Sequence, residues 1–383
     1  MRIVFVTHYA ELYGANRSLI DLITGIRKLH PAFDPMVILP FEGKMTNKLK
    51  CLKVDYRVIP FHSSVTIEAS SKTKAFFKGL AKLLINRLLL LKHSAALRRF
   101  NPDIVHSNSS VFSFGSQLAA KLKKPHVWHI REFVYEDYHY KYSLGELAFR
   151  KQLNRAACAI AISSAIRNKR CQHLLCECET IYNGVVFEED IIRKTKGERF
   201  VFGMVGIITR GKNQLEGIKA FGRLANEYSD ISLKLYGDFA DENYETEIND
   251  YIHTHDLARR IRFEGHKESI NEIFKNIDCL IQPAHHEAMG RVTAEAMSYG
   301  VPVAGYDGAA TSELLTHDKN GLLYKTEDQL YRILKEYLKN DSMYNRLSLE
   351  SIKTVKERFT IDKYAANIFS VYKRILTHKL QAT

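Results

Sequence analysis

Short apolar runs alternate with longer amphipathic stretches along the chain of 383 residues. Ten of these runs have the length and the β-branched or aromatic content of buried strands, and helical periodicity fills most of the segments between them. Five lie before residue 135 and five after residue 195: "RIVFVTH", "PMVILP", "YRVIPF", "DIVHSN" and "PHVWHI", then "FVFGMVG", "SLKLYG", "IRFEG", "DCLIQPA" and "VPVAGY". Apolar strands alternating with helices are typical of parallel sheets covered on both faces, so the pattern predicts an α/β protein with two sheet domains.

The boundary between the two predicted domains is expected at the dipeptide Asn183-Gly184, which follows a short strand and signals a turn. We therefore expect an N-terminal domain over residues 1–184 and a C-terminal domain over residues 185–361. The final periodic stretch supplies no strand. We expect this segment, residues 362–383, to form a helix that packs back on the first domain.

The turns that follow the first strand of each set carry no common nucleotide fingerprint. Neither the dinucleotide pattern G-x-G-x-x-G nor the phosphate loop G-x-x-x-x-G-K-[ST] is found there. Nicotinamide dehydrogenases and P-loop ATPases are therefore disfavoured. Open parallel sheets bind ligands at the carboxyl ends of their strands, so we expect a ligand in a cleft between the two domains.

The positive charge of the chain is concentrated in its first half. The whole sequence has a formal net charge of +13, and residues 1–185 hold 28 Lys and Arg against 13 Asp and Glu. The remaining residues hold 28 and 30, so the basic excess belongs to the N-terminal domain. We expect this domain to face an anionic partner.

Much of the excess comes from one segment between Glu68 and Asp103, which has eight basic residues and no acidic one. Its apolar residues recur at helical spacing, which predicts a helix over residues 72–99. A basic amphipathic helix can lie on an anionic membrane surface. The alternative is a helix packed on the sheet with a solvated lysine face, and both descriptions can hold at once. The apolar residues available for one broad face are Phe76, Phe77, Leu80, Leu83, Leu84, Leu88 and Leu91.

The sequence shows no membrane-spanning or secretion signal. No uninterrupted apolar stretch has the roughly 18 residues of a membrane span, and "MRIVFVTHYA" is typical of a first strand rather than a leader. The six cysteines are few for this length, so disulfides are not expected. We expect a cytoplasmic protein that is soluble or bound peripherally at the inner face of the cell membrane.

One group of potential zinc ligands occurs in "CQHLLCEC", which contains Cys171, His173, Cys176 and Cys178. Its spacing matches no common zinc module, and no second cysteine pair follows. Free thiols near a helix end are the favoured interpretation, and we expect no metal site.

The stretch "HEAMGRVTAEAMSYGVPV" carries two glutamates, Glu287 and Glu295, on either side of a Gly-Arg pair. Glycine inside a helix costs roughly 1 kcal/mol relative to alanine, so Gly290 is expected to precede a helix on which Glu295 lies. The free N–H groups around Gly290, Arg291 and Val292 then form an anion site at the positive end of the helix dipole, suited to a phosphate. Glu295 can accept hydrogen bonds from a vicinal diol such as a ribose, and Glu287 reaches another part of the same ligand.

Several motifs occur together and in order along the chain. These are "YGANRSL" after the first strand, "YNGV" at the domain boundary, "VGIITRGKNQLEGIKAF" in the second domain, and the E-x7-E arrangement with "GRVTAEAMSYGVPV". Together they resemble retaining glycosyltransferases of family 4, also called glycosyltransferase group 1, over nearly the whole chain. The resemblance implies the GT-B fold, an α/β architecture of two Rossmann-like parallel-sheet domains facing a cleft. It also implies sugar transfer from a nucleotide-diphosphate sugar.

The resemblance also implies roles for individual residues in this stretch. Glu295 matches the glutamate that holds the ribose of the nucleotide. Glu287 matches the glutamate that contacts the donor sugar, and we count it among the catalytic residues. Backbone groups of Met289, Gly290 and Arg291 are expected beside the sugar and the diphosphate.

The cations that the family places at the leaving diphosphate are incomplete here. Lys212 in "RGKNQ" matches the family lysine that neutralises the diphosphate. The family usually has an arginine directly after the glycine of this strand end, whereas Ile207 follows Gly206 in this chain. Either Arg210 replaces the missing cation from the same loop, or the leaving group is less well stabilised.

Four further positions match the family near the ends of strands. Gly14 resembles the glycine that lets the first-domain backbone approach the donor phosphates, with an ordinary strand-to-helix turn as the alternative. His129 in "VWHIREF" matches a histidine that contacts the donor sugar, with a structural histidine as the alternative. Gly237 in "LYGDF" and His266 in "FEGHK" match positions beside the nucleotide base.

The implied reaction needs neither a metal nor a cofactor. Negative charge develops on the diphosphate as it leaves, and preorganised cations and N–H groups stabilise it. The sequence also lacks the D-x-D signature of metal-dependent glycosyltransferases. The expected acceptor is a glycan, or a glycan linked to a membrane lipid, in surface polysaccharide synthesis.

Three other functions compete with this interpretation. Ile207 leaves open a catalytically silent partner subunit with the same fold, and a nucleotide-sugar epimerase shares the fold but fits the motifs less well. A basic nucleic-acid-binding protein is the remote alternative. We expect no nucleic-acid partner, because the basic residues gather on an apolar helix without interleaved stacking aromatics.

Overall fold

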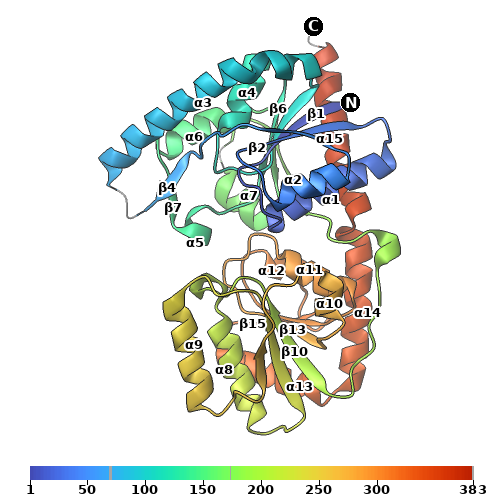
Figure 1. The fold of residues 1–383 in the computed structure, drawn as a ribbon. Helices are drawn as coiled ribbons and strands as arrows, with labels where there is room; N and C mark the ends of the chain where they lie inside the picture. The colour runs from blue at the N-terminus through green and yellow to red at the C-terminus, as the bar shows by residue number, and fades with distance from the viewer. Residues whose placement is uncertain (69–70, 173, 382–383) are drawn as a thin grey trace. The chain divides into compact units, whose positions relative to one another are not determined.

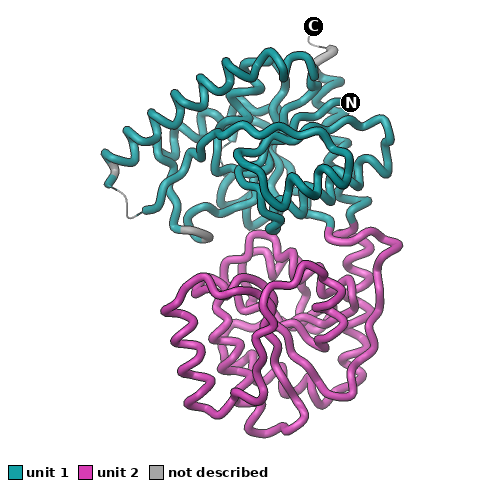
Figure 2. The backbone as a smooth tube through the Cα atoms, in the orientation of Figure 1, with its two compact units in different colours: residues 1–184, 361–383 teal, residues 185–360 magenta. Residues whose placement is uncertain are grey.

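The computed structural model describes residues 1–68, 71–172 and 174–381 of the chain. It consists of two compact units, one formed by residues 1–184 with 361–383 and the other by residues 185–360 (Figure 2). We call them unit 1 and unit 2 and describe each by itself. Among the described residues, no helix is both long and apolar enough to span a bilayer.

Unit 1 is built around a parallel sheet of seven strands in the order β3-β2-β1-β5-β6-β8-β9, with helices on both sides (Figure 1). Its strands are β1 (Arg2–Val6), β2 (Asp34–Leu39), β3 (Asp55–Val58), β5 (Ile104–Ser107), β6 (His126–Ile130), β8 (Cys158–Ala161) and β9 (Cys178–Thr180). Its helices are α1 (Gly14–Leu29), α2 (Lys44–Cys51), α3 (Lys72–Phe100), α4 (Phe114–Leu122), α5 (Tyr135–Tyr138), α6 (Glu146–Leu153), α7 (Ser164–Arg170) and α15 (Ile361–Gln381). Two short strands, β4 (Val65–Ile67) and β7 (Tyr140–Tyr142), pair antiparallel outside this sheet.

Unit 2 repeats the plan with a parallel sheet of six strands in the order β12-β11-β10-β13-β14-β15 (Figure 1). Its strands are β10 (Phe200–Val205), β11 (Ile231–Tyr236), β12 (Ile261–Phe263), β13 (Cys279–Gln282), β14 (Val303–Tyr306) and β15 (Leu322–Tyr324). Its helices are α8 (Gln214–Ala225), α9 (Glu242–Thr254), α10 (Ile270–Phe274), α11 (Arg291–Ser298), α12 (Thr311–Leu314), α13 (Glu327–Leu338) and α14 (Asp341–Arg358). Two short 3-10 turns, Glu188–Asp190 and Arg210–Lys212, complete it.

The last helix of the chain belongs to the core of unit 1. Tyr364, Ile368 and Tyr372 of α15 are buried among the side chains of α1 and of the central strands. Gly25 permits the close approach of α1 and α15, since a Cβ atom there would lie 2.8 Å from the Cβ of Ala365. The chain therefore passes through unit 2 and returns to complete the fold of unit 1.

All ten strands predicted from the apolar runs are confirmed, and so is the α/β class with two parallel sheets. The prediction missed β8, β15 and the β4–β7 pair. The sequence of β8, "CAIA", is rich in alanine, which has low strand propensity. The other three strands have three residues each, too few for a periodic pattern.

The strand order creates one switch point in each sheet. The connections reverse direction between β1 and β5 in unit 1 and between β10 and β13 in unit 2. Parallel α/β sheets bind ligands beyond the carboxyl ends of the strands at such a point. The loops that follow these four strands are therefore where the functional residues are to be sought.

Candidate active site

The switch point of unit 2 brings Lys212 and Glu287 together. Lys212 ends the 3-10 turn after β10, and its Nζ lies 2.7 Å from Oε2 of Glu287 in the loop after β13. The side chain of Glu287 is mostly buried, whereas 41% of the lysine side chain is exposed. The Nε2 of Gln282 lies 3.4 Å from the same carboxylate oxygen. A cation and a carboxylate from the two loops that flank the switch point thus form one charged pair.

Glu287 also fixes the start of α11. Its Oε1 accepts a hydrogen bond from the N–H of Gly290 at 3.3 Å. Gly290 has a φ of 77°, the left-handed region that favours glycine, and α11 begins at Arg291, as the sequence predicts. The first N–H groups of a helix have no acceptor within it and lie at the positive end of the dipole. The N–H groups of Arg291 and Val292 belong to such a first turn. Met289, which comes just before Gly290, is buried.

Glu295 is buried on α11 and is paired with Arg291. The Nε of Arg291 lies 2.8 Å from Oε1 of Glu295, one helical turn away, and only 2% of the glutamate side chain is exposed. The guanidinium of Arg291 donates a charge-assisted hydrogen bond that orients this buried carboxylate. A diol that binds Glu295 has to share this carboxylate with Arg291.

A second polar cluster joins the same two loops of unit 2. The Nδ2 of Asn213 donates to Oε2 of Glu216 at 2.7 Å and lies 3.1 Å from Nε2 of His285. The ring of His285 stacks on Tyr306 with 3.8 Å between the ring centroids. These residues were not predicted from the sequence, although Asn213 and Glu216 lie one and four positions after Lys212 in "KNQLEG". Their contacts hold the lysine loop beside the loop of Glu287.

Arg210, expected at the diphosphate, lies against helix α9 in this structure. Its guanidinium lies 2.6 Å from Glu247 and 3.9 Å from Asp241, at α9 and its N-cap, and stacks over the ring of Tyr244. These carboxylates draw the side chain away from Lys212. Ile207 is exposed at the position where the family has its arginine.

Gly237 and His266 lie at the carboxyl edge of the sheet of unit 2, where backbone groups dominate. A Cβ atom on Gly237 would lie 2.0 Å from the carbonyl oxygen of Gly206, and its φ is 145°. Its N–H donates to the carbonyl of Gly265 at 2.9 Å, and the N–H of His266 donates to Asp238 at 3.2 Å. The ends of β10, β11 and β12 therefore approach one another too closely for a side chain at position 237.

In unit 1, Gly14 is the first residue of α1, the helix that follows the loop after β1. A Cβ atom at Gly14 would meet no other atom within 4 Å, so the fold itself does not require glycine there. The preceding loop is held by Asn16, whose Nδ2 donates to the carbonyls of Tyr9 and Glu11. The position is therefore open to a ligand at the start of a helix.

His129, expected to contact the donor sugar, is buried within unit 1. Its side chain has no exposed surface, and its Nδ1 lies 3.2 Å from His106 and 3.3 Å from Arg131. Burial lowers the pKa of His129 well below its usual value, so the ring is neutral. His129 lies within β6, one residue before its end. The residues that reach the carboxyl end of the strand are Arg131 and Glu132.

Arg131 links three parts of unit 1. Its guanidinium donates to Asn108 at 2.9 Å, to Asn183 at 2.7 Å and to the hydroxyl of Tyr364 at 3.0 Å. These partners lie after β5, near the end of the unit's first segment and on α15. Arg131 thus connects the switch point of unit 1 to the helix that returns from unit 2.

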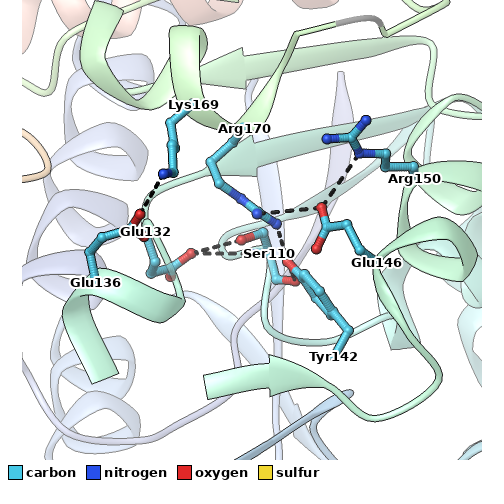
Figure 3. Close-up of polar contacts among 8 residues, drawn as sticks. All are labelled: Ser110, Glu132, Glu136, Tyr142, Glu146, Arg150, Lys169 and Arg170. Atoms are coloured by element: carbon cyan, nitrogen blue, oxygen red, sulfur yellow. Dashed lines mark hydrogen bonds and ion pairs between the residues drawn. The ribbon is translucent and has the colours of Figure 1, made fainter. Parts of the chain in front are cut away.

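Glu132 anchors a further polar cluster, which Figure 3 shows. Its carboxylate accepts hydrogen bonds from the N–H and the hydroxyl of Ser110, both at 3.2 Å. The hydroxyl of Tyr142 donates to the carbonyl of Ser110, and Arg170 donates to that hydroxyl while it pairs with Glu146. Burial raises the pKa of Glu132, only partly offset by the serines and Arg131. The signal in the sequence was the charged pair in "HIREF", directly after a buried strand.

The potential zinc ligands of "CQHLLCEC" are only partly described by the structure. His173 lies outside the described residues, and Cys171 is buried. In the described part of the chain, one group of three possible ligands was found: Cys158, Glu177 and Glu179. The guanidinium of Arg374 pairs with both of these glutamates, so their charges are already partly balanced by a side chain.

Comparison with known proteins identifies both halves of the chain. Residues 14–189 match the model of the glycosyltransferase family 4, and residues 186–354 match that of the glycosyl transferases group 1. A lipopolysaccharide core mannosyltransferase, LpsB of Rhizobium meliloti, is 26% identical over 35% of this chain and 39% of its own length. The capsular polysaccharide glycosyltransferase CapM of Staphylococcus aureus is 22% identical over 79% of this chain and 83% of its own.

Solved structures share the fold over the whole chain. The crystal structure of Anabaena HepE with UDP and glucose has a TM-score of 0.77 and 19% identity, and the match covers 97% of this chain and 99% of that one. S. aureus TarM in a complex that contains UDP has a TM-score of 0.74 and 12% identity, over 97% and 99%. With the two family matches spanning residues 14–354, the chain belongs to the glycosyltransferases of family 4 and group 1 and has their GT-B fold.

Proposed function

We propose that this protein transfers a sugar, with retention of configuration, from a nucleotide-diphosphate sugar to a glycan acceptor. The observation that carries the proposal is the pair of Lys212 and Glu287 at the start of α11. It places one cation, one carboxylate and the positive end of a helix at the switch point of unit 2. These are the groups needed by a ligand with a diphosphate and a hydroxylated ring next to it.

The diphosphate is expected to replace Glu287 as the partner of Lys212. When the donor binds, Lys212 turns its ammonium group from the carboxylate to the phosphate oxygens, and the N–H groups that open α11 bind the same oxygens. Glu287 is then free to accept hydrogen bonds from the sugar hydroxyls. The contact between Lys212 and Glu287 already holds both side chains close to their working positions, which limits the reorganisation on binding.

Bond breaking follows from the same charges. The bond between the anomeric carbon and the phosphate oxygen breaks, and the electron pair stays on the diphosphate, which Lys212 and α11 stabilise. The acceptor oxygen attacks the anomeric carbon from the face that the diphosphate leaves, and its proton passes to a phosphate oxygen. Glu287 positions the sugar in this scheme and forms no bond to it. We therefore propose that the reaction proceeds without a metal ion and without a cofactor besides the donor.

The nucleotide is proposed to bind along the carboxyl edge of unit 2. Glu295 holds the ribose together with Arg291, and the base lies by Gly237 and His266, where backbone groups are available. HepE has been crystallised with UDP, with UDP and glucose, and with UDP-glucose. By analogy we propose a UDP-sugar as the first donor to test.

Unit 1 is proposed to hold the acceptor. Glu132 is a buried carboxylate at the carboxyl end of β6, and the neighbouring Arg131 is hydrogen-bonded to the side chain of Asn108. We propose that Glu132 accepts a hydrogen bond from an acceptor hydroxyl, and that His129 positions Arg131. Relatives named for lipopolysaccharide core and capsular polysaccharide synthesis suggest a surface polysaccharide. A lipid-linked glycan at the cytoplasmic face of the cell membrane is the acceptor we propose.

The test measures thermal stabilisation of the purified protein by UDP, GDP, dTDP and ADP, with EDTA present. We expect a selective shift with one nucleotide that is reduced in the Lys212→Ala and Glu295→Gln variants. Incubation with the matching nucleotide sugars then reports hydrolysis of the donor, and NMR of a transfer product reports its anomeric configuration. Absence of a shift with every nucleotide would overturn the proposed donor site.

One observation favours a second function, that of a catalytically silent partner subunit. Ile207 stands where the family has an arginine, and Arg210 is engaged by the carboxylates of Glu247 and Asp241. Lys212 is then the one lysine or arginine that we assign to the diphosphate. Nucleotide binding without any donor hydrolysis or transfer would favour the silent partner over the enzyme.

A further inference from the structure

Helix α3 carries apolar side chains on two opposite faces. One face packs into unit 1 through Ala75, Leu90 and Leu97, all buried. Asn86 on the same face is buried and exchanges two hydrogen bonds with the backbone of His62, at 2.8 and 3.0 Å. The helix is therefore firmly fixed to its own unit, and its other face is available for something else.

The outward face of α3 is an apolar stripe, which we define as Phe77, Leu84, Leu88 and Leu91. The spacing of seven, four and three residues aligns these side chains along one side of the helix, and each is 58% to 65% exposed. The centre of this surface is therefore apolar, while solvated basic residues of α3 lie beside it. Soluble proteins seldom expose an aligned row of large apolar side chains without a partner for it.

Cations flank the stripe, and carboxylates are nearly absent. The six exposed basic residues beside it are Lys74, Lys78, Arg87, Lys92, Arg98 and Arg99. Across residues 69–131 the sequence has one acidic residue, Asp103, whose carboxylate accepts from the N–H of Arg2. The surface thus combines an apolar centre with a strongly positive surround.

A groove of about 570 Å³ adjoins the stripe within unit 1, on the side of α3 where α4 and α6 lie (Figure 1). Its apolar lining comes from Leu83, Leu90, Leu91 and alanines of α4, and Leu91 belongs to the stripe as well. Its basic lining consists of Arg87, Lys121, Lys124 and Arg155. These four cations have no carboxylate partner in the part of the chain that the structure describes.

The groove lies away from the residues proposed for catalysis. His126, which lines it, is the first residue of β6, whereas Arg131 and Glu132 follow the other end of that strand. Lys121 and Arg155 lie at or beyond the carboxyl ends of α4 and α6. The amino ends of the strands thus face this groove, so it is separate from the switch point at their carboxyl ends.

We propose that the stripe and the groove together bind the surface of an anionic phospholipid bilayer. The stripe lies among the acyl chains next to the headgroups, and the groove takes the phosphate of one lipid between its four cations. Charge complementarity decides the partner, because a surface that is apolar at its centre and basic around it matches the boundary between acyl chains and anionic headgroups. This membrane contact is separate from donor binding and does not depend on it.

Two other partners fit the surface less well. A second copy of the chain would cover the apolar stripe but would bring the flanking cations of both copies together without carboxylates to pair them. A nucleic acid would meet the cations but would leave large aliphatic side chains against phosphates and water. Only a lipid surface satisfies both the leucines and the cations.

The test is co-sedimentation of the full chain with vesicles in the absence of nucleotide. Vesicles of phosphatidylcholine alone are compared with vesicles that also contain phosphatidylglycerol, at about 0.15 M salt. We expect binding to the anionic vesicles to be at least about tenfold stronger than to the neutral ones. Equal binding to both, or none to either, would overturn the proposal.

Two variants and two matched controls separate the parts of the surface. Leu84→Ser with Leu88→Ser removes the centre of the stripe, and Lys121→Glu with Lys124→Glu reverses the charge of the groove. Each is expected to weaken binding to the anionic vesicles by about tenfold or more. Leu349→Ser and Lys275→Glu, at exposed positions of unit 2, are expected to leave it unchanged. Unchanged binding in the groove variant would overturn the lipid-phosphate site.

Further readouts distinguish this proposal from the others. Each variant should keep the thermal shift with nucleotide seen for the parent chain, since neither touches the donor residues. If the parent chain shows no such shift, the vesicle result still stands alone and the failure belongs to the donor site. A dimer in analytical ultracentrifugation without lipid that Leu84→Ser with Leu88→Ser dissociates would assign the stripe to self-association and overturn the membrane proposal.

Discussion

The ammonium group of Lys212 lies 2.7 Å from the carboxylate of Glu287, although 75 positions separate the two residues in the chain. The contact joins the loops after β10 and β13, which flank the point where the strand order of unit 2 reverses. Each residue is thus held by the other at the place where the fold positions a ligand. This arrangement makes Lys212 the residue whose loss is most informative about the proposed reaction.

Replacement of Lys212 by alanine is expected to lower the rate of sugar transfer by about a hundredfold or more, because one cation is lost at the leaving diphosphate. The free energy of unfolding should change by less than about 1 kcal/mol, since the side chain is 41% exposed and such pairs contribute little. Initial rates with a saturating donor and urea unfolding measure the two effects. Lys219→Ala, in the next helix, is the matched control, and a Lys212→Ala enzyme of normal rate would contradict the proposal.

Replacement of Arg291 by methionine removes the guanidinium that lies beside the buried Glu295 carboxylate. Loss of one member of a buried ion pair costs about 3 kcal/mol, so this variant should unfold at a clearly lower urea concentration. The double variant Arg291→Met with Glu295→Leu has no buried charge, and it should recover most of the lost stability.

Nucleotide binding separates structure from function in this pair. If Glu295 holds the ribose, the double variant stays as weak in nucleotide binding as Glu295→Gln alone, even though its stability has recovered. Isothermal titration calorimetry with the nucleotide that stabilises the parent chain measures this. Recovery of affinity together with stability would show that Glu295 only supports the fold.

Three buried histidines of unit 1, together with the partly buried His8, make its stability sensitive to acid. Burial lowers the pKa of His8 to about 4 and that of His126 to about 3, and it lowers those of His106 and His129 well below 6.5. Below pH 6.5 the unfolded chain binds protons that the folded chain does not, so the stability present above pH 6.5 is lost as the pH falls toward 4. The loss amounts to about 1.4 kcal/mol per pH unit for each such histidine.

Urea unfolding of the chain at pH 7, 6 and 5 checks this expectation. His126→Gln should show a shallower fall than the parent chain, because its amide can still reach Ser107, which His126 contacts at 2.9 Å. The same pH slope in both proteins would exclude His126 as one of the groups responsible.

Glu132 offers a prediction on the acceptor side. The Glu132→Gln variant keeps the shape of the side chain and an oxygen that can accept from Ser110. Its nucleotide affinity and its unfolding midpoint are therefore expected to match those of the parent chain. If Glu132 binds an acceptor hydroxyl, kcat/KM for the acceptor falls by about tenfold to a hundredfold, with donor hydrolysis unchanged. An unchanged value would limit Glu132 to a structural role.

The sequence predicted the strands and the start of α11 well, because buried parallel strands form continuous apolar runs and Gly290 signals the helix start. It predicted the environments of charged side chains poorly. His129 was expected to contact a ligand, but its position near the end of a strand does not show whether neighbouring side chains cover it. In the structure they bury it completely. Arg210 was expected at the diphosphate, but its side chain pairs with Glu247 instead. Glu247 lies on the helix after the next strand, and only the structure shows that this helix comes close to Arg210. Such contacts depend on loop geometry, which a single sequence does not encode locally.

Gly237 and Gly14 provide a matched pair of glycine substitutions at the carboxyl edges of the two sheets. In Gly237→Ala the new Cβ would lie 2.0 Å from the carbonyl oxygen of Gly206 at a φ of 145°, so the backbone has to move. We expect a loss of stability of about 2 kcal/mol or more, with weaker nucleotide binding as a consequence.

In Gly14→Ala the Cβ enters open space at the first position of α1, so stability should be kept or slightly increased. If the family role of Gly14 holds, this variant nevertheless loses affinity for the nucleotide sugar while its affinity for the free nucleoside in unit 2 is unchanged. Normal affinity for both would make Gly14 an ordinary strand-to-helix turn.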